Sequence, residues 1–183
     1  MAGETGRPTA YSGGQKLLHW AIALLVLAMI PVGLYMVRRG AATNFDAATN
    51  ALYTAHKTFG MLILLLMALR LALRLGRGAP APEPTLTPVQ RIGSESVHGL
   101  LYVMLFVVPL LGWAGISAYP ALGILGGYQL PALLAPNQPL AETLLKYHGY
   151  AALAVAGLVA LHIGAALFHR LILKDGVLRR MLP

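Results

Sequence analysis

The sequence predicts an all-α integral membrane protein, a four-helix bundle with both termini in the cytoplasm. Three observations support this prediction. Apolar residues make up 57% of the 183 residues and charged residues only 11%, against about 25% charged in soluble domains. Four apolar stretches each reach the length of about 20 residues that a bilayer-spanning helix needs. The 14 basic residues are unevenly divided between the two sides of these stretches.

The chain is expected to form one domain over residues 1–183, with helices at approximately 15–38, 53–75, 96–119 and 143–173. The first apolar core is uncharged and too long for a cleaved signal peptide. The second helix carries basic residues only near its ends, where long side chains reach the interface. Residues 76–93 are rich in Pro and Gly and predict a polar surface loop. Residues 120–139 carry no charge, and we expect them to lie at the membrane surface.

Charge predicts the orientation and excludes several classes of protein. Only four basic residues fall on the side away from the termini: Arg38, Arg39, Lys57 and Lys146. Positive charge concentrates in the cytoplasm, so both termini are expected there. The net charge of +8 follows this membrane pattern and not a nucleic-acid-binding surface. Cysteine is absent, which excludes disulfides, iron–sulfur clusters, thiolate zinc sites and covalently attached haem.

Six histidines equal Asp and Glu in number: His19, His56, His98, His148, His162 and His169. Histidine inside a spanning helix is costly and indicates function. His148 and His162 are two heptads apart, so they share a helix face and differ in depth by about 21 Å. Helix direction then predicts two levels, His56 with His148 on the outer side and His19 with His162 on the inner side.

Two histidine pairs with no carboxylate nearby favour bis-histidine haem b over zinc, because zinc normally takes four protein ligands and haem iron needs only two. Arg70 and Arg74 share the face of His56 but lie at the inner level, where they could pair with haem propionates. Outer propionates could be met by Arg38, Arg39 and Lys57. Anchoring of the helix ends at the interface is the open alternative for all five residues.

These features resemble the bacterial cytochrome b561 family, in particular its small four-helix di-haem members. The matching motifs are Leu18-His19-Trp20, Arg39-Gly40, Ala55-His56 with Gly60, Leu69-Arg70-Leu71, Leu73-Arg74-Leu75, His148-x13-His162-x6-His169, Lys174-Asp175 and Leu178-Arg179-Arg180-Met181. The resemblance implies a multi-pass protein of the bacterial inner membrane with two haem b groups. Its ligands would be His19 and His162 for one haem, and His56 and His148 for the other.

The remaining histidines are expected to have other roles. His98 opens the third helix near the inner face, and we interpret it as a packing or propionate-contacting residue. His169 lies about 10 Å beyond His162, where it could bind the headgroup of a quinone and exchange a proton. The alternative for His169 is a surface histidine at a helix end.

Two haems at different depths predict electron transfer across the membrane, with ubiquinone as the mobile partner. Some small family members are superoxide oxidases, so the resemblance implies an oxidoreductase that passes electrons from superoxide to ubiquinone. An excess of basic residues on the outer side would attract a small anion. Two alternatives stay open: a quinol-linked cytochrome b or anchor subunit serving a dehydrogenase or periplasmic carrier, and a haem-free proton or metal transporter. The apolar cores contain no Asp or Glu, which disfavours the transporter.

Overall fold

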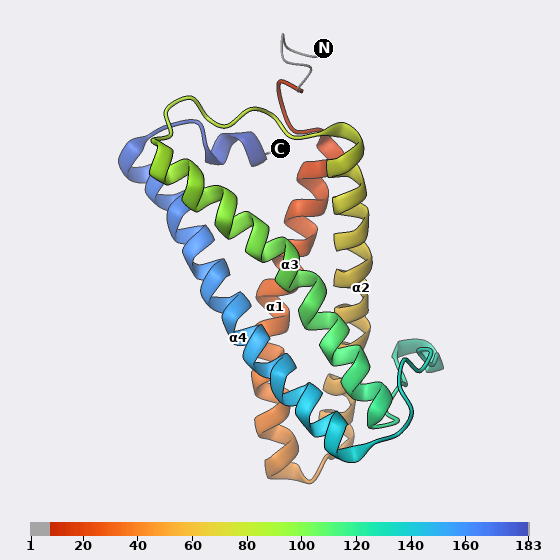
Figure 1. The fold of residues 1–183 in the computed structure, drawn as a ribbon. Coiled ribbons are helices and arrows are strands. Elements are labelled where there is room, and N and C mark those ends of the chain that lie inside the picture. The colour runs from red at the N-terminus through yellow and green to blue at the C-terminus, as the bar shows by residue number, and fades with distance from the viewer. Residues whose placement is uncertain (1–7, 183) are drawn as a thin grey trace.

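The computed structural model describes residues 8–182 and contains four long helices arranged as a bundle (Figure 1). They are α1 (Gly13–Thr43), α2 (Ala47–Arg77), α3 (Pro88–Ala118) and α4 (Gln138–Phe168). Each has 31 residues, or about 46 Å, which exceeds the roughly 30 Å of bilayer hydrocarbon. All four are long and apolar enough to cross a membrane. The predicted all-α, four-helix membrane fold is confirmed.

The helices extend beyond the apolar stretches because polar residues outside those stretches cap them. Each helix N-terminus has a side chain that accepts a backbone hydrogen bond; these N-caps are Ser12, Asp46, Thr87 and Asn137. Two of them form capping boxes, in which Gln15 and Gln90 bond back to the cap residue. Such caps satisfy amide groups that the helix itself leaves free. The helices therefore begin in the polar flanks, two to eight residues before hydrophobicity alone predicts.

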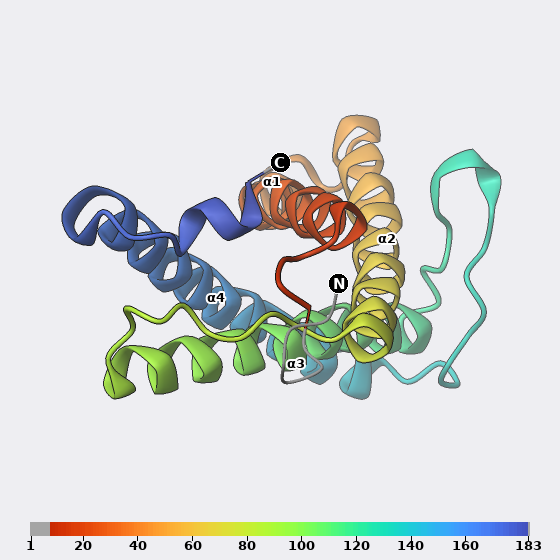
Figure 2. The same ribbon diagram turned by 90° about the horizontal axis from the view of Figure 1, so that it is seen from above.

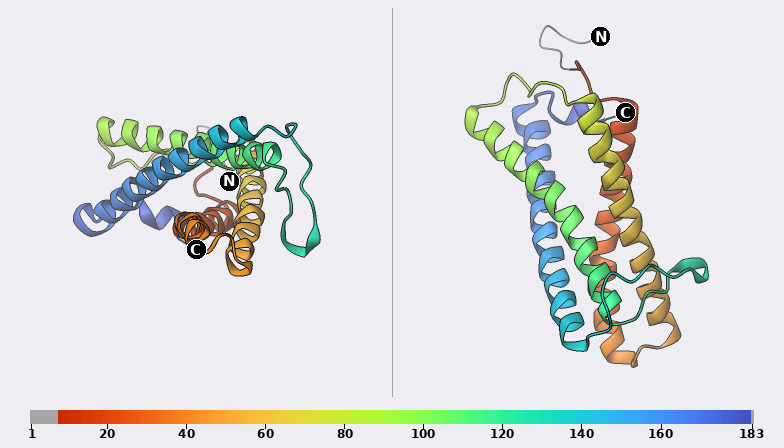
Figure 3. Two further views of the ribbon diagram at one scale, coloured as in Figure 1. Left: turned by 90° about the horizontal axis from the view of Figure 1, so that it is seen from below. Right: turned by 45° about the vertical axis from the view of Figure 1, so that its right-hand side comes forward.

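The four helices form two pairs. α1 lies along α2 and α3 along α4, while contacts between α1 and α4 are sparse (Figure 2). The described chain begins and ends at the same end of the bundle as the loop between α2 and α3 (Figure 3). We call this the terminal end. The opposite end carries the α1–α2 turn and the α3–α4 connection, and we call it the hairpin end.

A small buried core occupies the middle of the bundle. It consists of Ile22, Val26, Ile63, Met67 and Val155. Val155 is seven residues from both His148 and His162, or about 10 Å along the helix axis from each. The core is therefore an apolar layer between the two levels of histidine. Large apolar side chains elsewhere on the helices are widely exposed, as lipid-facing residues are.

The uncharged connection between α3 and α4 forms a hairpin that projects beside α2 (Figures 1 and 2). An isolated bridge joins Gly123 and Gln129, and a short 3₁₀ turn, η1 (Leu125–Gly127), lies at its tip. Two hydrogen bonds tie the hairpin to α2: Lys57 Nζ donates to the Ala121 carbonyl at 2.8 Å, and Thr58 Oγ1 accepts from the Leu125 amide at 3.0 Å. The hairpin is thereby fixed to the bundle.

Close packing of α3 on α4 predicts a destabilising substitution at Gly115. A Cβ atom there would lie 2.7 Å from Leu145 Cδ2 and 2.8 Å from Cγ, so Gly115→Ala forces Leu145 aside and is expected to lower stability by about 1–2 kcal/mol. The control is Gly157→Ala on α4, where a Cβ meets nothing within 4 Å and helix propensity improves. Thermal unfolding in detergent measures both. Equal shifts in the same direction would contradict the packing argument.

The cap of α2 predicts a pH-dependent stability. Hydrogen bonds from Thr49, together with the Arg39 guanidinium 2.7 Å away, hold the pKa of Asp46 below its usual value. A carboxyl with a lowered pKa stabilises the fold above its unfolded pKa of about 3.9 and loses that effect as pH falls. Asp46→Asn keeps a capping oxygen but loses the charge. We expect it to unfold at a lower temperature than wild type at pH 7, with the difference vanishing near pH 3.

The matched control is Glu142→Gln, which changes an exposed carboxylate that caps no helix. It should leave the pH profile of unfolding unchanged. An Asp46→Asn deficit that persisted undiminished at pH 3 would contradict the role of the charge.

Candidate functional site

The structure brings four histidines together as two pairs, one at each level. The rings of His19 on α1 and His162 on α4 have centroids 6.1 Å apart and planes at 75°. The rings of His56 on α2 and His148 on α4 also have centroids 6.1 Å apart, with planes at 84°. Helix α4 therefore contributes one histidine to each pair, and the partner comes from a different helix each time.

This spacing fits a metal ion held between two imidazoles. A metal–imidazole bond is about 2.0–2.1 Å long, so two rings bound on opposite sides of one ion have centres about 6 Å apart. Within residues 8–182, no group of three or more His, Cys, Asp or Glu side chains could hold a metal ion. Two axial ligands suffice only when another group fills the remaining positions, as a porphyrin does around iron.

The outer pair sits where neighbouring helices carry glycine. A Cβ at Gly33 of α1 would lie 3.2 Å from His56 Cε1, and one at Gly112 of α3 would lie 3.1 Å from His148 Cε1 and Nδ1. Both positions are therefore tight for any larger residue. His148 Nδ1 lies 2.9 Å from the Val108 carbonyl. A carbonyl only accepts, so this nitrogen carries the proton and Nε2 is left free to bind a metal.

His56 provides a second observation that is consistent with a bound ligand at the outer pair. Its Nδ1 is buried and has no hydrogen-bond partner among the described residues. Buried polar atoms nearly always have a hydrogen-bond partner, so a buried nitrogen without one calls for an explanation such as a bound ligand. A ligand at this site is consistent with such a ring.

His98 lies against the inner pair. Its ring centroid is 5.0 Å from that of His162, with planes at 80°, and its Nδ1 lies 2.6 Å from the Ser94 carbonyl. The edge-to-face arrangement is a packing contact. It is consistent with the packing role expected from the sequence, although the closeness to His162 was not anticipated.

Arg70 and Arg74 also lie at the inner level, where both approach the ring of Tyr102 on α3. Their guanidinium carbons are 5.8 and 5.5 Å from its centroid. Arg70 additionally donates to the Gln15 carbonyl at 2.9 Å, one helical turn before His19. Neither arginine has an acidic partner within 4.0 Å among the described residues. Two unneutralised cations beside the inner pair favour an anionic group there.

Basic residues at the hairpin end are partly engaged with the protein itself. Arg39 pairs with Asp46 at 2.7 Å, and Lys57 binds the hairpin carbonyl of Ala121. Arg38 is exposed, as is Lys146, whose Nζ lies 5.9 Å from the Tyr150 ring centre. The surface at the hairpin end therefore keeps an excess of positive charge, although two of its four basic side chains have local partners.

His169 is buried at the C-terminal end of α4, where its Nδ1 lies 2.5 Å from Asp175 Oδ2. This location differs from a simple surface histidine. Asp175 was not predicted as the partner of His169, although an acid six residues after a histidine at a helix end is a visible signal. The contacts of Gly33 and Gly112 were not predicted either, because they depend on how the helices pack.

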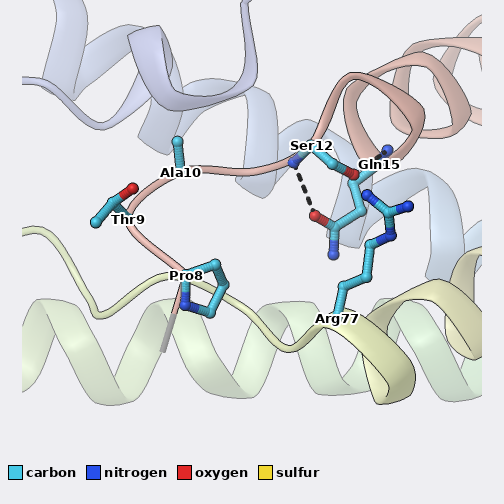
Figure 4. Close-up of a pocket in the computed structure, with 6 residues that line it drawn as sticks. All are labelled: Pro8, Thr9, Ala10, Ser12, Gln15 and Arg77. Carbon is cyan, nitrogen blue, oxygen red and sulfur yellow. Dashed lines mark hydrogen bonds between the residues drawn. The ribbon is translucent and has the colours of Figure 1, made fainter. Parts of the chain in front are cut away.

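A pocket of about 370 Å³ lies at the terminal end, between the segment leading into α1 and the end of α2 (Figure 4). It is lined by Pro8, Thr9, Ala10, Ser12, Gln15 and Arg77. No histidine is among these residues. The pocket therefore lies beside the inner pair's end of the bundle but is separate from both histidine pairs.

Comparison with known proteins gives relatives along nearly the whole chain. Cytochrome b561 homolog 2 of Escherichia coli strain K12 is 29% identical over 179 residues, covering 97% of this chain and 94% of the relative. The probable superoxide oxidase CybB of Yersinia pestis is 29% identical over 174 residues, with 94% and 96% covered. Cytochrome b562 of Cereibacter sphaeroides is 33% identical over 177 residues, with 94% of each chain covered. The sequence model of the prokaryotic cytochrome b561 family matches residues 10–183, and the protein belongs to this family.

Proposed function

We propose that the protein is a di-haem b-type cytochrome of the bacterial inner membrane that transfers electrons from superoxide at its outer face to ubiquinone. Family membership establishes the coarser statement, a haem-binding electron-transfer protein of the membrane. The observation that carries the finer proposal is the pair of matched imidazole contacts, each 6.1 Å between ring centroids, at two depths of one bundle.

Haem bound by two histidines supplies reversible one-electron chemistry and has no open position for oxygen to bind at the iron. The residues that would hold it are His19 with His162 at the inner level and His56 with His148 at the outer level. Gly33 and Gly112 leave the outer imidazoles room, and the Val108 carbonyl orients His148. Such second contacts raise the basicity of a ligating histidine and fix its ring.

Arg70 and Arg74 would neutralise the propionates of the inner haem. They lie side by side over Tyr102 without an acidic partner among the described residues. Pairing of a guanidinium with a carboxylate is strong and directional. Their position supports this role over that of anchors alone, since an anchoring arginine has no need to converge with another on one ring.

The apolar core between the two levels would exclude water and ions from the middle of the bundle. Its member on α4, Val155, lies about 10 Å from each histidine level along the helix axis, and no Asp or Glu lies between the two levels on any helix. A proton or metal ion therefore has no acidic side chain to bind between the two levels, whereas electron transfer does not require one. This arrangement favours electron transfer over a transporter.

Superoxide as the donor is supported by charge at the hairpin end and by one relative. Arg38 and Lys146 are exposed there, while Asp46 is paired with Arg39. A surplus of positive charge raises the encounter rate of a small anion. The Yersinia pestis relative is named a probable superoxide oxidase. Ubiquinone would bind at the terminal end near His169, with both termini in the cytoplasm by the distribution of basic residues.

Haem stoichiometry tests the assignment of ligands. His19→Ala and His148→Ala each remove one ligand of one pair, so each variant should retain about half of the haem of the wild type. His98→Ala is the matched control and should retain all of it. Pyridine-haemochrome assay and the dithionite-reduced α and Soret bands measure the content. A colourless wild-type protein with an intact fold would favour the transporter instead, and haem loss in His98→Ala equal to that in His19→Ala would contradict the pairing.

Superoxide-driven reduction of ubiquinone-1 tests the donor. The rate should fall as ionic strength rises, because salt screens the attraction of the anion. Replacing Arg38 and Lys146 together by Gln should lower the rate by about threefold to tenfold at low salt. The control is Arg91→Gln at the other end, where Arg91 pairs with Glu95. Haems that superoxide fails to reduce but quinol reduces readily would instead support the quinol-linked alternative.

A further inference from the structure

The chain reverses sharply after α4 and returns an acid to the histidine at the helix end. A π-helical turn, η2 (His169–Leu173), follows α4 and ends at Lys174, whose backbone is left-handed with φ 56° and ψ 30°. This reversal places Asp175 Oδ2 2.5 Å from His169 Nδ1. The two side chains are only 11% and 7% exposed, which makes this the most buried ion pair in residues 8–182.

The contact fixes both groups. A carboxylate only accepts, so His169 Nδ1 carries the hydrogen and Nε2 faces away from the acid. The second carboxylate oxygen, Oδ1, accepts from the Val177 amide at 3.1 Å. Burial opposes ionisation of Asp175, but the hydrogen bonds from His169 and Val177 hold its pKa below the usual value. No described residue hydrogen-bonds to His169 Nε2, so that nitrogen is available to a ligand.

Closing the helix does not require this charge. The carbonyl of His169 already accepts from the Lys174 and Asp175 amides, and a neutral Asn or Ser could serve the Val177 amide equally well. A buried carboxylate costs free energy unless a partner compensates it. Here the partner is an imidazole, which carries a compensating positive charge only when it is protonated.

The segment after the dyad is held rigidly across the terminal end. Arg180 donates to the Ala81 carbonyl at 2.6 Å and lies 3.7 Å from Glu83. Trp20, the neighbour of His19 on α1, donates from Nε1 to the Met181 carbonyl at 2.8 Å. The dyad is therefore part of a frame that joins the end of α4 to the helix carrying an inner ligand.

We propose that Asp175 is the positioning residue of a proton-donating dyad, holding His169 so that Nε2 protonates a quinone oxygen at the inner end of the electron path. This proposal rests on the proposed function and adds the source of the protons. Reduction of one quinone to quinol takes two electrons, which two superoxide ions supply on becoming two molecules of O₂. It also takes two protons, one for each oxygen as a C=O becomes C–OH. His169 Nε2 gives one proton to the oxygen that it faces, and water gives the other to the oxygen across the ring. Cytoplasmic water reprotonates the imidazole, and Asp175 stays ionised throughout.

The test uses the holoprotein with its haems reduced anaerobically, mixed with ubiquinone-1, and follows the loss of the reduced α band. Asp175→Asn should keep both haem bands, slow the saturating rate of haem reoxidation by about tenfold or more, and change the half-saturating quinone concentration by less than about threefold. Asp175→Glu should recover part of the rate. The matched control is Glu95→Gln, another carboxylate in an ion pair, outside this frame, which should react at nearly the wild-type rate.

A double variant separates positioning from a purely structural role. If Asp175 acts through His169, then Asp175→Asn adds no further slowing to His169→Ala. Additive slowing, equal slowing by Glu95→Gln, or a wild-type rate in Asp175→Asn would overturn the dyad. Should Asp175→Asn fail to fold, His169→Gln and Asp175→Glu carry the comparison, and wild-type rates in both would overturn it. A wild-type protein that quinone does not reoxidise would contradict the proposed function itself.

Discussion

The two proposed haem sites depend on one constraint: two imidazoles from different helices must face each other at a separation that one metal ion can bridge. Helix α4 meets this constraint twice, because His148 and His162 lie two heptads apart on the same face. Their partners come from α2 and α1, whose opposite directions put one histidine near each end of the bundle. One helix therefore takes part in both pairs, which joins α4 to α1 at one level and to α2 at the other.

Charge is arranged around the same constraint. No acid lies between the histidine levels, and the inner pair has the guanidinium groups of Arg70 and Arg74 near it. Acids appear at the helix ends, where they cap or pair: Asp46 at the start of α2 and Asp175 after α4. A bound group with its own negative charges would complete this distribution, since Arg70 and Arg74 meet over one ring without an acidic partner among the described residues.

Much of the architecture was predictable because membrane helices follow simple rules. Apolar length predicts four spanning helices, and the spacing of 14 residues predicts two levels on one face of α4. The helix ends were harder to predict, because caps such as Ser12 and Thr87 lie in polar flanks that a hydrophobicity pattern does not detect. The depth of the histidines and the direction of the helices were enough to predict the two pairs. That these pairs ligate haem stays a prediction.

Other features required the packed structure. The contacts of Gly33 and Gly112 with histidines depend on which helices become neighbours. The engagement of Lys57 by the hairpin depends on how the connection between α3 and α4 folds back on α2. Asp175 reaches His169 only because a π turn and a left-handed residue reverse the chain. Sequence periodicity describes faces of regular helices, and each of these contacts lies outside that description.

Electron paramagnetic resonance of the oxidised protein tests whether the two histidine pairs each ligate a haem, because it reports the ligands of each iron and the angle between their rings. The planes within the two histidine pairs lie at 75° and 84°. Ligation by these pairs predicts two low-spin ferric signals, both of the strongly anisotropic kind that nearly perpendicular imidazoles produce. A dominant high-spin signal, or one low-spin centre per chain, would contradict it.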